Sequence, residues 1–236
     1  MNNITRKILE YFNCPYTVFT KDIKPKVIEE DYLKALEDCK GKDWYPALVI
    51  SNEDLLYVIT NHIDRKQLII DCEDNGKEKL DSRCYIEDID IEEDEEIFYK
   101  KMGKKRTFSP VNHFVALMLL EDTLEEVILF QIPVGNPWEL IAWLPIGGWN
   151  EYLDPKEMIS VAKYWYEQYG AVPAVFKHDM LEFYLEKEVR SDVTIGLAIE
   201  HVALCPDRIN QGTKTGTISE IAASLVDEHV WTFWWD

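Results

Sequence analysis

The sequence lacks the motifs by which common enzymes and cofactor-binding proteins are identified. Its 236 residues contain no Gly-x-Ser-x-Gly nucleophile elbow, no His-Glu-x-x-His zinc motif and no Gly-x-Gly-x-x-Gly dinucleotide fingerprint. The five cysteines are scattered and form no Cys-x-x-Cys pair, which disfavours a zinc ribbon or a redox motif. We therefore expect neither a bound metal nor a cofactor.

Basic residues are scarce as well. The chain has 25 Lys and Arg against 44 Asp and Glu, which gives a formal net charge of −19 at pH 7. Contacts to nucleic-acid phosphates need clustered Lys and Arg, and an anionic membrane surface repels a protein this acidic. We therefore expect no nucleic acid and no membrane as a partner, whereas a basic protein or a small molecule would fit.

Long apolar runs are missing too. No stretch approaches the roughly 18 apolar residues of a transmembrane helix, and residues 1–10 lack the apolar core of a signal peptide. An odd number of dispersed cysteines is typical of free thiols in a reducing compartment. The sequence thus predicts a cytoplasmic protein.

What the sequence does contain is the pattern of a folded α/β protein, with 47% hydrophobic residues and eight tryptophans. Strand and helix patterns alternate near the start, which suggests partly parallel pairing, and the whole predicts a mixed α/β (α+β) fold with helices on a mixed sheet of about five to seven strands. We expect the aromatic terminal strand to be internal, because an exposed apolar edge promotes aggregation. The predicted strands are 16–20, 46–50, 67–70, 126–132, 173–176, 181–185 and 230–236.

Three helix starts are marked by capping residues. Asn136-Pro-Trp-Glu139 and Asp154-Pro-Lys-Glu157 each place a capping side chain before proline and a glutamate at the third helical position. Thr217-Ile-Ser-Glu220 is a third capping box. These signals predict a short helix to about Trp143, a long helix ended by Gly170 and a last helix to about Asp227.

The domain organisation is read from one acidic segment. Acidic residues make up about half of residues 71–96, which suggests a solvated insertion rather than a core element. We expect one domain over residues 1–236, with an internal seam near residues 90–109.

Several motifs of the second half resemble one bacterial family. From about residue 126 to 236 the chain is similar to the family catalogued as domain of unknown function 4253. The resemblance implies a fold and a set of characteristic positions, but no reaction. The motifs are Asn136-Pro-Trp-Glu139, Trp143-Leu-Pro through Gly147-Gly-Trp-Asn-Glu151, Cys205-Pro-Asp207, Gln211-Gly212 and Trp231 to Asp236.

The candidate site residues come from four of these motifs, the last of which is the terminal strand. Glycines allow close backbone approach, so the residues after Gly147-Gly148 can be aimed into a cleft. Glu151 and Asp207 are candidate catalytic residues, because two carboxylates in different environments form the usual acid–base pair. The candidate ligand-binding residues are Trp149, Asn150, Asp207, Gln211 and Trp235.

Each candidate also has a purely structural interpretation. Asn150 and Glu151 could form the loop that leads to the Asp154 cap, and Asp207 could pair with Arg208 or accept backbone N–H groups. His201 and Cys205 are four residues apart and could face one side of a helix, but a metal site would need a further ligand.

Two functions therefore stay open at this stage. The first is a cytoplasmic binding or interaction module, for which neutralisation of a basic partner is one candidate role. The alternative is a hydrolase-like or ligand-processing enzyme that uses Glu151 and Asp207. If these two carboxylates and Gln211 surround one concave pocket, the enzyme hypothesis gains.

Overall fold

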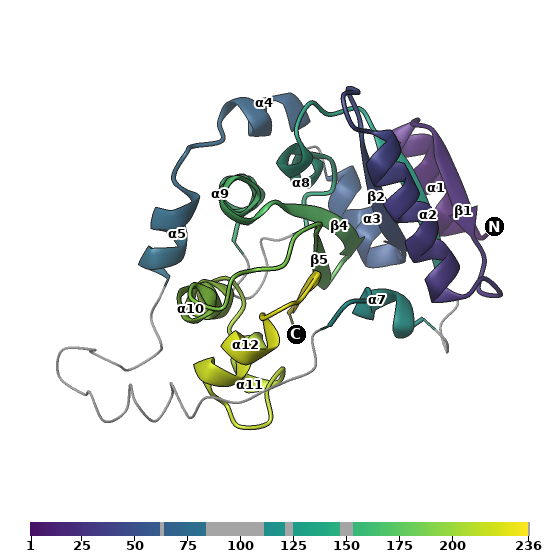
Figure 1. Cartoon of the computed structure of the whole chain (residues 1–236). Coiled ribbons are helices and arrows are strands. Elements are labelled where there is room, and N and C mark those ends of the chain that lie inside the picture. Colours follow the sequence, from purple (N-terminus) through teal and green to yellow (C-terminus); the bar gives the residue numbers. More distant parts are fainter. Residues whose placement is uncertain (62–63, 84–110, 121–124, 147–152, 236) are drawn as a thin grey trace.

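Six strands form one mixed sheet in the order β1-β3-β2-β4-β5-β6. Strands β1, β2, β4 and β5 are labelled in Figure 1. The computed structural model describes residues 1–61, 64–83, 111–120, 125–146 and 153–235. Strands β2 and β4 are parallel, and the other neighbouring strands are antiparallel. The predicted mixed α/β fold is confirmed. The strands are β1 (Tyr16–Phe19), β2 (Tyr45–Ser51), β3 (Glu126–Ile132), β4 (Ala171–Lys177), β5 (Met180–Leu185) and β6 (Val230–Trp234).

Helices contribute hydrophobic cores on both faces of the sheet. The smaller core involves α2 (Pro25–Asp38) and α7 (Val115–Met118). The larger core receives side chains from α1 (Asn3–Phe12), α3 (Glu53–Thr60), α5 (Gly76–Ser82), α8 (Leu140–Trp143), α9 (Pro155–Tyr169), α10 (Thr194–Leu204) and α12 (Ile218–Ser224).

No helix in the part of the chain that the structure describes is long and apolar enough to cross a membrane.

The three predicted helix starts are confirmed. Asn136 precedes the short helix η1 (Pro137–Glu139), and the Glu139 carboxylate accepts hydrogen bonds from the amides of Gly135 and Asn136. The side chains of Asp154 and Thr217 each accept a hydrogen bond from the third residue of the helix that follows. Capping is a local interaction, which is why the sequence alone predicts it.

Residues 67–70 belong to a helix, so the strand predicted there is wrong. They lie in α4 (Arg65–Ile70), whose first turn is capped by Asp64. One oxygen of this carboxylate accepts hydrogen bonds from the amides of Lys66 and Gln67, at 3.1 and 3.2 Å. The run contains only three apolar residues after Gln67, and so short a run fits a helix as well as a strand. Here the cap decides between them.

The described part of the acidic segment contains α5, which packs on α9. Leu80 of α5 is buried, and a Cβ on Gly76 would lie 2.2 Å from the Ser160 carbonyl oxygen. Only glycine permits this approach between the two helices. Residues 84–96 of the segment and the predicted seam at 90–109 lie outside the described residues, so the domain boundaries stay predictions.

The terminal strand β6 lies at an edge of the sheet, so the prediction that it is internal is wrong. Its pairing with β5 leaves the carbonyl groups of Thr232 and Trp234 pointing away from the sheet. The Cys205 thiol donates to the Trp234 oxygen at 2.9 Å, and Arg208 Nη1 donates to the Thr232 oxygen at 2.7 Å. Side chains thus occupy the place of a neighbouring strand, which removes the hazard of an open edge.

A stacked arginine joins the N-terminal helix to the second half of the chain. The Arg65 guanidinium lies 4.7 Å from the ring centre of Tyr11, 5.2 Å from that of Phe12 and 4.3 Å from that of Trp143. The rings of Phe12 and Trp143 are themselves stacked, 6.1 Å apart. A planar cation among three aromatic rings connects α1, α4 and α8.

We predict that Arg65→Ala destabilises the protein. Three cation–π contacts of about 0.5 kcal/mol each give a loss of about 1.5 kcal/mol in the free energy of unfolding. Arg65→Lys keeps the charge but not the stacking plane, so it should recover only part of this loss. Urea denaturation measures both, with the exposed neighbour variant Lys66→Ala as a control. An Arg65→Ala protein as stable as the control would contradict the prediction.

Candidate functional site

A pocket of about 230 Å³ lies between β6, the start of α7 and the turn that joins α11 (Asp207–Asn210) to α12. Figure 1 shows α11 and α12 together near the C-terminus. The volume corresponds to roughly eight water molecules at about 30 Å³ each. The charged and hydroxyl-bearing residues that line it are Arg208, Glu220, Glu228, Thr213, Ser224 and Thr232, and the apolar ones are Val111, Val115, Ile221, Val230 and Trp234.

Arg208 is the cation of this pocket, and it is buried. Pro206 and the short helix α11 place it against β6, where its Nη1 donates to the Thr232 carbonyl oxygen. The guanidinium also lies 5.2 Å from the ring centre of Phe233. In the described part of the chain it forms no other hydrogen bond and no ion pair. Since a guanidinium carries five N–H donors, most of them remain free to bind a ligand.

Gly212 allows the chain to turn at the wall of the pocket. A Cβ at this position would lie 2.5 Å from the Arg208 carbonyl oxygen and 2.8 Å from Cη2 of Trp234. The first contact is with backbone and cannot be relieved by a side-chain rotation. The glycine of the Gln211-Gly212 motif therefore allows α11 to end next to β6.

Glu228 is a carboxylate of the same pocket that interacts electrostatically with Arg208. It is 2% exposed, and its Oε2 atom is buried without a hydrogen-bond partner among the described residues. Burial raises the pKa of this carboxyl to about 7, although the nearby Arg208 charge lowers it. A carboxyl with this pKa exchanges protons near neutral pH, which general acids and bases require.

A second carboxylate, Glu182, holds residues of the pocket wall in place through hydrogen bonds. It lies on β5 directly opposite Thr232 and accepts a hydrogen bond from the Thr232 hydroxyl at 2.7 Å. It also accepts the amides of Val115 and Ala116, at 2.8 and 3.3 Å, and so fixes the start of α7. Burial raises the pKa of Glu182 to about 7 against the effect of these three donors. The side chain is committed to these contacts and acts as a positioning group.

The predicted residues Asp207 and Gln211 lie beside the pocket and bind each other. Gln211 Nε2 donates to Asp207 Oδ1 at 3.2 Å, and the Gln211 amide donates to the Asp207 carbonyl oxygen at 2.8 Å. Asp207 forms no ion pair with Arg208, so the pairing considered from the sequence is wrong. Two adjacent residues thus have different roles: Asp207 bonds to Gln211 at the ends of α11, while Arg208 lines the pocket.

Trp235, another predicted ligand-binding residue, lies on the opposite face of β6 from the pocket. Its ring stacks on Phe233 with the ring centres 6.2 Å apart, in the larger core. Trp149, Asn150 and Glu151 fall outside the residues that the structure describes. Their predicted roles therefore stay proposals.

His201 lies behind β6 in a cage of aromatic rings. Its ring is fully buried, with centres 4.7 Å from Trp231, 4.8 Å from Phe233 and 5.1 Å from Trp165. Neither ring nitrogen has a hydrogen-bond partner in the described structure. Cys205 bonds to a backbone carbonyl instead of meeting His201 at a metal, and the described residues include no cluster of three or more such ligands.

Four residues of the site were not among those predicted from the sequence: Arg208, which was considered only as a partner of Asp207, and Glu182, Glu228 and Thr232. The sequence contains a signal for one of them. Glu182 interrupts the apolar strand Met180–Leu185, and a charged residue within such a strand is rarely buried unless it has partners. Glu228 and Thr232 carry no comparable signal, because only the fold brings them to Arg208.

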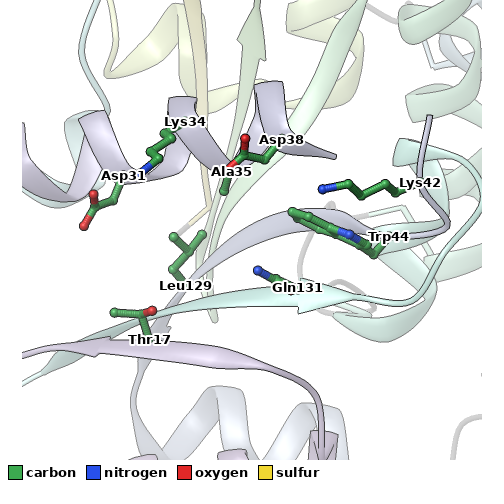
Figure 2. Close-up of a pocket in the computed structure, with 9 residues that line it drawn as sticks. All are labelled: Thr17, Asp31, Lys34, Ala35, Asp38, Lys42, Trp44, Leu129 and Gln131. Atoms are coloured by element: carbon green, nitrogen blue, oxygen red, sulfur yellow. The ribbon is translucent and has the colours of Figure 1, made fainter. Parts of the chain in front are cut away.

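A second pocket, of about 390 Å³, lies between α2 and the strands β1 and β3 (Figure 2). Asp31, Lys34 and Asp38 extend from α2, while Trp44 lies at one end with Lys42 Nζ 5.5 Å from its ring centre. Its two acidic and two basic side chains are all exposed, so their charges are screened by water. We therefore regard the Arg208 pocket, with its buried charges, as the candidate site.

Comparison with known proteins identifies one family. The model described as domain of unknown function (DUF4253) matches residues 128–236, which confirms the resemblance drawn from the motifs. All residues that line the Arg208 pocket fall in this range except Val111 and Val115. No curated protein and no solved structure matches the chain.

Proposed function

We propose, from the premise that residues 128–236 belong to the DUF4253 family, that the protein is a binding module for a small carboxylate-bearing molecule. The ligand would occupy the Arg208 pocket, with its carboxylate on the free N–H groups of the guanidinium. Arginine matches the planar geometry of a carboxylate, and burial strengthens the charge-assisted hydrogen bonds.

One observation supports this proposal above the others. Two of the motifs that carry the family resemblance line this pocket: the Gln211 motif supplies Gly212, and the terminal motif supplies Thr232 and Trp234. Arg208 is the residue that directly follows the Cys205-Pro-Asp207 motif. A role in covering the β6 edge would explain the bond to Thr232. It would not explain why a buried guanidinium faces a pocket with donors to spare.

The test is a calorimetric titration with matched small probes. We use 4-methylpentanoate, L-leucine, the neutral amide 4-methylpentanamide and inorganic phosphate. At least one of the two carboxylates should bind at least tenfold more tightly than the amide, because the amide cannot form the ion pair. If phosphate binds and neither carboxylate does, the proposal of a carboxylate ligand is refuted and the site binds phosphate instead.

Arg208→Lys is the variant that tests the site without removing its charge. It should weaken carboxylate binding at least tenfold, since lysine lacks the planar pair of donors. The matched control is Arg190→Lys, an exposed arginine paired with Asp192 on the surface. Carboxylate binding that survives Arg208→Lys unchanged, or binding of no probe at all, would refute the proposal.

The alternative proposals have narrower support. An enzyme using Glu151 and Asp207 is one alternative, for which the support is that Asp207 precedes the pocket residue Arg208 and that Glu228 in the pocket is a carboxyl with a pKa of about 7. Consumption of a bound probe during the titration would favour the enzyme. A basic protein partner is supported by the net charge of −19, and such a complex should weaken steeply with added salt.

For the location we propose the cytoplasm. The support is the number and state of the cysteines: five in the chain, of which Cys14, Cys39, Cys72 and Cys205 are free thiols in the structure.

A further inference from the structure

Arg208 and Glu228 carry opposite charges into the same pocket but do not touch. Both are buried, and no ion pair joins them. Each influences the ionisation of the other, so they are close enough to interact through space. Separated buried charges of this kind are costly unless another group lies between them.

The unused atoms of the two side chains are complementary to a zwitterion. Arg208 has free donors, and Glu228 Oε2 is a buried acceptor that lacks a donor. Apolar side chains also line the pocket, Val115, Ile221 and Trp234 among them. A ligand that carries an anion, a cation and an apolar group would satisfy all three parts of the pocket.

We infer that the ligand is an α-amino acid with an apolar side chain, whose carboxylate binds Arg208 and whose ammonium group binds Glu228. This inference rests on the proposed function and adds the identity of the second charged contact. The size agrees, because a pocket with the volume of roughly eight water molecules admits an amino acid such as leucine but not a peptide.

The experiment compares L-leucine with 4-methylpentanoate, which lacks the amino group, and with 3-methylbutylamine, which lacks the carboxylate. At pH 8 leucine should bind at least tenfold more tightly than either, as measured by calorimetry. Glu228→Gln should lower the affinity for leucine at least tenfold but should not lower that for 4-methylpentanoate, because the loss of a nearby negative charge does not weaken the binding of a carboxylate. Asp227→Asn is the matched control, because it removes an exposed charge next to Glu228 and should change neither affinity.

A pH series on the unaltered protein covers the case in which Glu228→Gln does not fold. The advantage of leucine over 4-methylpentanoate should grow as the pH rises through about 7, because Glu228 then becomes ionised. Equal, Arg208-dependent binding of both carboxylates at every pH would overturn this inference and leave the proposed function standing. If neither carboxylate binds in an Arg208-dependent manner, the proposed function fails together with the inference.

Discussion

Replacing Arg208 with alanine should lower the free energy of unfolding by about 3–5 kcal/mol, the cost expected when one of two interacting buried charges is removed. The variant leaves the Thr232 carbonyl without its donor and Glu228 buried without a nearby cation. For a chain of this length each kcal/mol corresponds to a shift of roughly 2–4 °C in the unfolding midpoint. Thermal and urea denaturation at pH 8, where Glu228 is ionised, measure the loss.

A double variant separates the two causes of that loss. In Arg208→Ala/Glu228→Gln the uncompensated negative charge is gone, whereas the unpaired Thr232 carbonyl remains. We expect the double variant to be more stable than Arg208→Ala by about 1 kcal/mol or more, a typical coupling energy for residues of one network. Simple additivity of the two single variants would show that the charges do not interact, which would remove the basis for a shared ligand.

Replacing His201 with leucine should stabilise the protein. The wild-type side chain buries a donor and an acceptor that have no partner in the described structure, at a cost of about 1–3 kcal/mol. Leucine has a similar size and fits a site lined by Trp165, Trp231 and Phe233. The control is His229→Leu, which removes a side chain that bonds to the Leu185 carbonyl at 2.8 Å and should bring no gain.

The gain from His201→Leu should increase as the pH falls. Burial, reinforced by the Arg208 charge, holds the pKa of His201 well below its ordinary value of 6.5. Below pH 6.5 His201 is therefore protonated in the unfolded chain but stays neutral in the folded protein. The free energy of unfolding of the wild type then falls by up to about 1.4 kcal/mol per pH unit. Glu182 and Glu228 act in the opposite sense, because their raised pKa values lower the free energy of unfolding as the pH rises from 4.5 to 7. Both groups are present in the wild type and in His201→Leu, so their effect cancels in the comparison.

The difference between the two stability curves thus isolates His201. Urea denaturation gives the free energy of unfolding of both proteins at pH 8, 6.5 and 5.5. The advantage of His201→Leu over the wild type should be nearly the same at pH 8 and 6.5 and larger at pH 5.5. A difference that stays flat down to pH 5.5 would mean that His201 takes up a proton in the folded state. In that case a polar partner, such as an internal water, must reach its ring.

Much of the fold follows from the sequence because its signals are local. Asp154 before Pro155 and Gly170 after Tyr169 delimit α9 correctly, since a cap needs only residues within one turn. The strand predicted at residues 67–70 was wrong because three consecutive apolar residues show no helical or strand periodicity, and the deciding cap at Asp64 lies outside the run. Local signals therefore predict where elements begin and end, but they do not distinguish a helix from a strand when the apolar run is short.

The place of β6 and the composition of the pocket could not be predicted in this way. An aromatic strand at an edge is acceptable only because Cys205 and Arg208, more than twenty residues earlier, bond to its outer carbonyls. Asp207 was an obvious candidate from its motif, but its neighbour Arg208 is the residue that enters the pocket. Which of two adjacent polar side chains points inward depends on the turn at Pro206, a property of the assembled structure.

The covered edge of β6 makes the two ends of the sheet unequal. At β1 the Gln131 amide bonds to the Pro15 carbonyl, so the backbone groups of Tyr16 and Val18 point away from β3. Tyr16 is 52% exposed there, and among the described residues no side chain bonds to the outer backbone groups of β1 as at β6. In the described part of the chain, β1 is therefore the edge at which a further strand could pair, whereas side chains already occupy that place at β6.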